Sequence, residues 1–119
     1  MEKMANLLNE GKKVARLKGN RNLDPQIVKK KKESMKKFGL LVPAVIMKGE
    51  DIVKQDIKIE DFETETEISA ENANQYIVLI EGNHRYKAHL ELLKANENLE
   101  EGQKYKNEFY VIYPLNPKM

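Results

Sequence analysis

The segment that constrains the fold most strongly is residues 76–89, with the sequence YIVLIEGNHRYKAH. A run of apolar residues ends at Glu81, Gly82 follows, and a polar, basic stretch of helical character begins at Asn83. This order predicts a strand, a tight turn and the first turn of a helix. The first backbone N–H groups of a helix have no intrahelical acceptor and lie at the positive end of the helix dipole. The segment therefore predicts a phosphate-sized anion site beside His84 and Arg85.

The side chains around this turn suggest both binding and catalytic roles. The guanidinium of Arg85 offers a planar fork of donors that matches phosphate oxygens. His84 is a candidate proton donor or acceptor, because an imidazole titrates near neutral pH, and the alternative is a histidine that only hydrogen-bonds the backbone. Glu81 is the second candidate catalytic residue. Glu81, and with less support Asp24, would also offer a carboxylate to Mg²⁺ bound with a nucleotide.

A second motif lies upstream, at residues 34–46, with the sequence SMKKFGLLVPAVI. A helix end, a Gly-Leu-x-x-Pro turn and a short apolar run follow one another there. The two motifs, in this order, resemble those of the ParB/sulfiredoxin superfamily. The resemblance covers about residues 20–115, apart from an insertion at about 49–75. It implies a single domain over residues 1–119 with an α+β fold, in which a small mixed sheet is flanked by helices as in the ParB N-terminal domain and in sulfiredoxin.

The resemblance also implies roles for particular residues. The phosphate-binding motif of the family corresponds to Gly82, Asn83, His84 and Arg85, and an arginine that precedes the first long helix in many members corresponds to Arg21. The chain departs from both subfamilies at this motif. Sulfiredoxin-like sequences have a cysteine where this chain has Asn83, which rules out thiol-based sulfinic acid reduction. Chromosome-partition relatives have Glu-Arg-Arg where this chain has Asn-His-Arg, so only the last arginine matches.

The function implied by the resemblance is binding of the phosphates of a nucleotide or a nucleic acid, in a protein of a plasmid, phage or other mobile element. A nucleoside triphosphate with Mg²⁺ is the implied cofactor. Nuclease or nucleoside-triphosphatase activity stays open, because relatives with these motifs include both enzymes and binders. The DNA-reading helical domain and the dimerisation tail of chromosome-partition proteins have no counterpart in this sequence, so the resemblance does not extend to a sliding clamp.

Charge is strongly segregated along the chain. Residues 1–40 contain 12 Lys or Arg against 4 Asp or Glu, whereas residues 49–75 contain 2 against 9. The basic part includes a run formed by Lys29, Lys30, Lys31 and Lys32. This run is either a solvated helix face or a contact for nucleic-acid phosphates. The acidic insertion is either an exposed hairpin or a mobile loop. It is either a solubilising surface or an arm that imitates nucleic acid or engages a basic partner, such as a host protein. The alternative function is therefore a small protein-interaction module that inhibits a host nucleic-acid enzyme.

The remaining elements are predicted from periodicity and capping. We expect a short helix within residues 1–10 and a strand at 13–17, which the resemblance places at a sheet edge. Asp24 and Pro25 predict the start of a helix that ends before Gly39. An apolar strand is expected at 41–47, where Pro43 requires a sheet edge or a strand beginning, and another at 109–113. The chain contains no cysteine. It also contains no apolar stretch long enough to span a bilayer, so we expect a cytoplasmic protein with no membrane partner.

Overall fold

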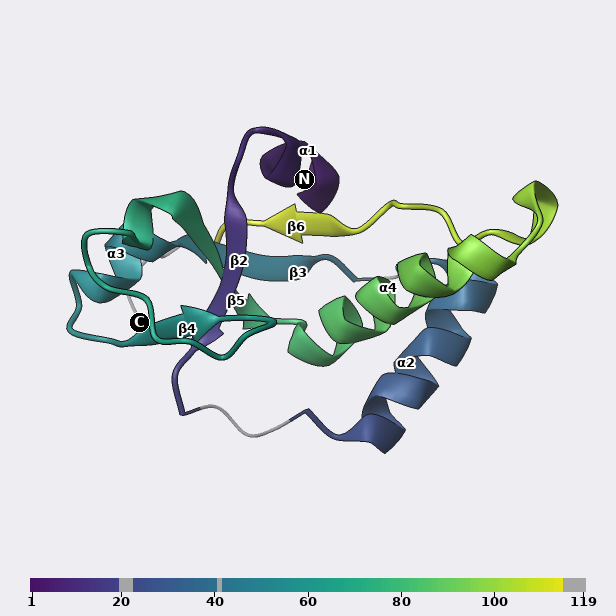
Figure 1. Cartoon of the computed structure of the whole chain (residues 1–119), viewed down its shortest axis with the longest axis horizontal. Coiled ribbons are helices and arrows are strands. Elements are labelled where there is room, and N and C mark those ends of the chain that lie inside the picture. Colours follow the sequence, from purple (N-terminus) through teal and green to yellow (C-terminus); the bar gives the residue numbers. More distant parts are fainter. Residues whose placement is uncertain (20–22, 41, 115–119) are drawn as a thin grey trace.

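The computed structural model describes residues 1–19, 23–40 and 42–114. It is an α+β fold built on a six-stranded mixed sheet with the strand order β1-β6-β3-β5-β2-β4 (Figure 1). The strands are β1 (Glu2–Lys3), β2 (Lys13–Leu17), β3 (Ala44–Lys48), β4 (Ile59–Asp61), β5 (Tyr76–Glu81) and β6 (Tyr110–Ile112). The α-helices are α1 (Met4–Asn9), α2 (Pro25–Phe38), α3 (Gly49–Val53) and α4 (Asn83–Ala95). Three 3₁₀ turns, η1 (Ala73–Gln75), η2 (Asn96–Asn98) and η3 (Glu101–Gln103), complete the described elements.

The central strand β5 is covered on both faces, which explains its uninterrupted apolar sequence. Ile77 and Leu79 pack into the core beneath α2 and α4. Val78 points to the opposite face and packs into a second core that includes residues of α3 and η1. Strand β5 pairs in parallel with β2 and antiparallel with β3. The predicted strand, turn and helix at 76–89 are therefore confirmed, and they lie at the middle of the sheet.

Helices α2 and α4 lie against the same face of the sheet and begin at the same end of it (Figure 1). Near their starts, the backbone N–H of Asp24 donates to Nε2 of His84. About two turns further along, Lys32 of α2 forms an ion pair with Glu91 of α4 at 2.9 Å. The two helices consequently run in the same direction. Helix α2 has the predicted boundaries, since the side chain of Asp24 accepts from Gln26 N at 2.9 Å and the helix ends at Phe38.

One predicted strand, β2, differs from expectation in its place in the sheet, and a second, β3, begins later than expected. Strand β2 is not at the edge, because β4 of the insertion pairs antiparallel with its outer side. Strand β3 begins directly after Pro43 and lies inside the sheet between β6 and β5. The proline therefore marks a strand beginning, which was one of the two predicted outcomes. At the N-terminus the expected helix is present, preceded by the two-residue strand β1, which pairs with β6.

The acidic insertion at 49–75 is folded onto the sheet. It supplies α3, β4, η1 and a hairpin closed by a bridge between Glu60 and Glu67. Its apolar side chains Ile52, Ile59 and Ile68 are buried in the second core. The predicted hairpin is therefore present, and its apolar side is buried against the rest of the protein. The alternative, a mobile loop, is not what the structure shows. Within the described part of the chain, no helix is both long and apolar enough to cross a membrane.

Candidate phosphate-binding site

Gly82 makes the turn between β5 and α4, and its conformation suits glycine alone. Its φ is +100°, in the left-handed region that side chains disfavour. A Cβ added at this position would lie 2.8 Å from Cβ of Ala44 and 3.1 Å from Nη2 of Arg85. Two consequences follow: the turn passes very close to β3, and the guanidinium of Arg85 lies directly against the turn.

The N-terminus of α4 is not capped by a side chain. The carbonyl of Gly82 accepts the first intrahelical bond, from Tyr86 N at 2.8 Å. Asn83 turns its amide back toward the strand, where Nδ2 donates to Leu79 O at 3.4 Å, and its buried Oδ1 finds no donor among the described residues. Buried polar atoms are nearly always paired, so this unpaired oxygen is an exception among the described residues. The free N–H groups of the first turn are the donors that an anion would use.

His84 connects the start of α4 to the start of α2. Its Nε2 accepts a hydrogen bond from the backbone N–H of Asp24 at 3.1 Å. This contact corresponds to the structural alternative predicted from the sequence, in which the histidine bonds the backbone. It also requires Nε2 to be unprotonated, so in this arrangement Nδ1 is the ring nitrogen left for a ligand.

Arg85 connects α4 to the second sequence motif. Its Nη1 donates to the carbonyl oxygen of Val42, in the segment between α2 and β3. Arginine carries five N–H donors, so one bond to a carbonyl leaves donors for a phosphate. The structure thereby brings together three segments distant in sequence, at Asp24, Val42 and the turn that begins at Gly82.

The other predicted site residues lie outside this cluster or beyond the described residues. The carboxylate of Glu81 is exposed at the end of β5 and makes no described hydrogen bond or ion pair. The carboxylate of Asp24 is already used to cap α2, which leaves Glu81 as the better candidate for Mg²⁺. Arg21 falls outside the described residues. In the lysine run, Lys29, Lys30 and Lys31 are exposed along α2, while Lys32 is half-buried against α4 in its pair with Glu91.

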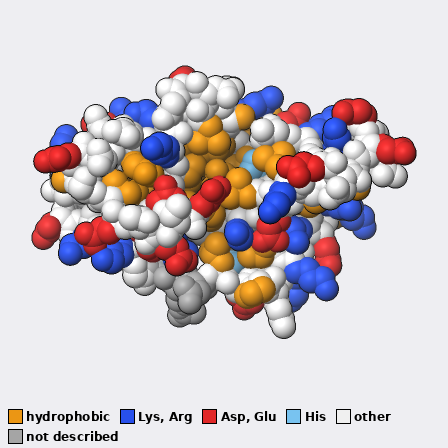
Figure 2. All heavy atoms as spheres, in the orientation of Figure 1, with side chains coloured by type: hydrophobic (Ala, Val, Ile, Leu, Met, Phe, Trp, Pro, Cys, Tyr) orange, Lys and Arg blue, Asp and Glu red, His pale blue; other side chains and the backbone are white. Residues whose placement is uncertain are grey.

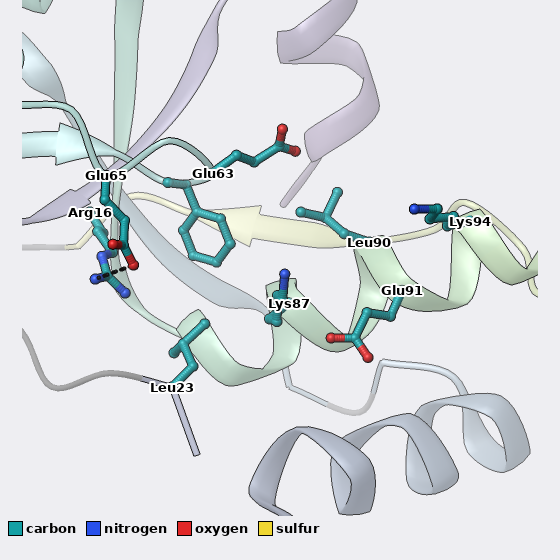
Figure 3. A pocket seen from close by; sticks show the side chains of 9 residues that line it. Arg16, Leu23, Glu63, Glu65, Lys87, Leu90, Glu91 and Lys94 are labelled. Atoms are coloured by element: carbon teal, nitrogen blue, oxygen red, sulfur yellow. Dashed lines mark hydrogen bonds and ion pairs between the residues drawn. The ribbon is translucent and has the colours of Figure 1, made fainter. Parts of the chain in front are cut away.

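A cleft of about 570 Å³ lies along α4, from Lys87, one turn after the helix start, to Lys94 (Figure 3). One wall is formed by Lys87, Leu90, Glu91 and Lys94 of α4, and the other by Phe62, Glu63 and Glu65 of the insertion hairpin (Figure 3). Leu23, which immediately precedes the capping Asp24, closes one end. On the molecular surface, apolar side chains are exposed on this face between charged ones (Figure 2).

Arg16 also lines this cleft and was not predicted as a site residue. It is 5% exposed, with its Nε 3.1 Å from Oε1 of Glu60 and its Nη2 3.5 Å from Oε1 of Glu65. Alternation along residues 13–17 places Arg16 on the same face as the buried Val14, and a charge on a buried face was the signal available in the sequence. The partner Glu60 could not be found that way, because it belongs to the insertion.

His89, in the middle of α4, is a core residue. It is 3% exposed, and its Nδ1 lies 2.8 Å from the hydroxyl of Tyr105. Burial lowers the pKa of His89 from 6.5 to about 4, and a hydrogen bond to Asn107 opposes this shift only in part. His89 is therefore neutral at physiological pH and contributes to packing.

Compared with known proteins, the chain matches no family model, no curated protein and no solved structure.

Proposed function

We propose that this protein has a ParB-like fold and binds the phosphates of a nucleotide or nucleic acid at the N-terminus of α4. The observation that carries the proposal is the convergence of an uncapped helix start, a glycine turn and an arginine at one place. A phosphate there would accept from the free backbone N–H groups and from the Arg85 guanidinium together. Charge-assisted bonds of this kind are about twice as strong as neutral ones.

The neighbouring helix α2 also favours anion binding at this site, because it begins beside the start of α4. The hydrogen bond from Asp24 to His84 brings the first turn of α2 beside the first turn of α4. Both helices therefore present the positive ends of their dipoles to the same region. The Asp24 carboxylate occupies one donor of α2, so α4 is the helix that keeps its donors for the ligand.

The cleft beside α4 offers room for the rest of a nucleotide. Lys87 lies one helical turn after Asn83 and lines the cleft, which continues along α4 past Leu90 to Lys94. A bound nucleoside would rest against the half-buried side chains of Leu23 and Leu90 while its phosphates face the helix start. If the nucleotide arrives with Mg²⁺, the exposed Glu81 is the carboxylate of this chain that would hold it.

The same contacts favour binding over proton transfer as the role of His84. Its Nε2 is engaged by the Asp24 N–H, and this bond would be lost if Nε2 took up a proton. In this tautomer Nδ1 of His84 carries the ring proton and can only donate, so a nuclease or nucleoside triphosphatase would need the Glu81 carboxylate as its proton acceptor. Assays of hydrolysis with both residues substituted in turn decide this point.

The test is calorimetric titration of the protein with CTP, ATP, GTP and short duplex DNA, with and without Mg²⁺. Arg85→Ala removes the guanidinium, and Lys54→Ala is the matched control, because it removes an exposed positive charge directly after α3. We expect saturable binding of at least one ligand that is lost in Arg85→Ala and kept in Lys54→Ala. Absence of binding to every ligand would overturn the proposal and favour the alternative, a protein-interaction module that uses the acidic insertion.

A further inference from the structure

Phe38 is an exposed aromatic residue at the end of α2 farthest from the proposed phosphate site. It is the last residue of the helix, and 62% of its surface is exposed. The helix has 14 residues, so Phe38 lies about 20 Å along its axis from the Asp24 cap. Most of this apolar ring is exposed, so its burial contributes little to stability, and nothing in the phosphate site requires it.

A groove of about 360 Å³ adjoins Phe38. It runs between the last turn of α2 and the segment that leads into β6, and two more aromatic rings, Tyr105 and Tyr110, line it. Tyr105 is held in place, because its hydroxyl lies 2.8 Å from Nδ1 of the buried His89 and its backbone pairs with Asn96. The groove therefore has one rigid aromatic wall and one freely accessible ring.

The charges around this groove are mainly positive. Lys36, Lys104 and Lys106 line it, against Glu108 as the single lining acid. Lys104 is paired with Glu101 at 2.7 Å, whereas Lys36 and Lys106 make no ion pair in the described structure. Lys37 adds a further charge, with its Nζ 5.3 Å from the centre of the Phe38 ring. The groove thus combines exposed aromatic surface with unpaired cations.

We infer that this groove binds single-stranded nucleic acid, with a base stacked on Phe38 and the adjoining phosphates beside Lys36 and Lys106. Aromatic rings bordered by lysines are the means by which proteins bind single strands without reading sequence, because every base has a face that can stack. In a duplex those faces are already covered, so the groove favours the single strand. The groove lies at the other end of α2 from the site around Gly82, so this inference does not depend on the proposed nucleotide site.

The test is fluorescence anisotropy of a labelled short oligothymidylate, titrated with the full chain. Stacking of one base on an aromatic ring contributes about 1–3 kcal/mol, so Phe38→Ala should weaken binding about 5-fold to 150-fold. Ile27→Ala is the matched control, since Ile27 is an exposed apolar residue near the start of the same helix. The combined variant Lys36→Ala and Lys106→Ala should flatten the dependence of affinity on salt. A hairpin duplex of matched length should bind more weakly than the single strand.

Three results would overturn the inference. The first is an oligothymidylate that does not bind, and the second is one that binds Phe38→Ala as well as it binds the unchanged protein. The third is binding that is lost in Arg85→Ala and retained in Phe38→Ala, which would place the strand at the start of α4. Loss of CTP binding in Arg85→Ala with oligothymidylate binding intact supports both proposals as separate sites. Thermal denaturation of each variant confirms that it is folded.

Discussion

Nε2 of His84 accepts the backbone N–H of Asp24 at 3.1 Å, and through this bond the first turn of α4 is tied to the first turn of α2. The two residues are 60 positions apart in sequence. The contact positions two helix dipoles at one place, so its removal should affect both the fold and the proposed site.

We predict that His84→Ala destabilises the protein by roughly 1 kcal/mol, the usual net value of one hydrogen bond. The Asp24 N–H is partly accessible, so water replaces the lost acceptor and limits the cost. Nucleotide affinity should fall as well, because α2 no longer has a fixed position beside α4. Urea denaturation and calorimetry measure the two effects. A variant with unchanged stability and unchanged affinity would show that the His84 contact has no such role.

Substitution at the turn should be more costly. Gly82→Ala forces a side chain into the left-handed region and brings its Cβ to 2.8 Å from Cβ of Ala44. We expect a loss of about 1–3 kcal/mol in the free energy of unfolding. Gly102→Ala is the control, since nothing lies within 4 Å of a Cβ there and its φ is not positive. Equal stability of the two variants in denaturant would contradict the description of this turn.

The buried ion pair across β2 and β4 gives a third prediction. Arg16 and Glu60 face each other in the sheet register and are both buried. Arg16→Met leaves the Glu60 carboxylate buried without its partner, which typically costs about 3–5 kcal/mol. Arg16→Met combined with Glu60→Leu should recover most of that loss, because both charges are then gone. Lys18→Met, which breaks an exposed pair with Glu67, should have a much smaller effect. If the double variant is no more stable than Arg16→Met, the uncompensated charge of Glu60 is not the cause of the loss of stability.

Buried His89 makes stability depend on pH. Burial lowers its folded pKa to about 4, whereas the unfolded chain titrates near 6.5. Between these values the unfolded state binds a proton that the folded state does not, so stability falls as pH falls from about 6.5 to about 4. The loss reaches up to about 3 kcal/mol below that window and is absent above it. His89→Gln should remove this part of the pH dependence. If the stability of His89→Gln falls as steeply with falling pH as that of the unchanged protein, carboxylates and not His89 cause the pH dependence.

The parts of the fold that were predictable are those set by local signals. Asp24 and Pro25 specify where α2 begins, because a capping carboxylate and a residue without an N–H satisfy a helix start locally. Gly82 likewise marks the turn between an apolar strand and a polar helix. Each of these signals lies within a few residues of the structure that it specifies.

The parts that were missed depend on contacts between distant segments. Alternation predicts that Arg16 lies on a buried face, yet the strand that brings Glu60 opposite it comes from the insertion. The acidic composition of residues 49–75 indicated a surface segment. It did not indicate that Ile52, Ile59 and Ile68 would be buried and hold this segment on the second face of the sheet. The hydrogen bond between His84 and Asp24 could not be predicted either, because no local sequence pattern indicates that two helices begin side by side.

We propose above all that the free N–H groups at the start of α4 bind phosphate, and amide NMR during titration with CTP reports on these groups themselves. We expect the backbone signals of Asn83, His84 and Arg85 to shift first and to saturate together, and we expect these shifts to be absent in Arg85→Ala. Shifts confined to the insertion at 49–75, or none at all up to saturating CTP, would contradict it.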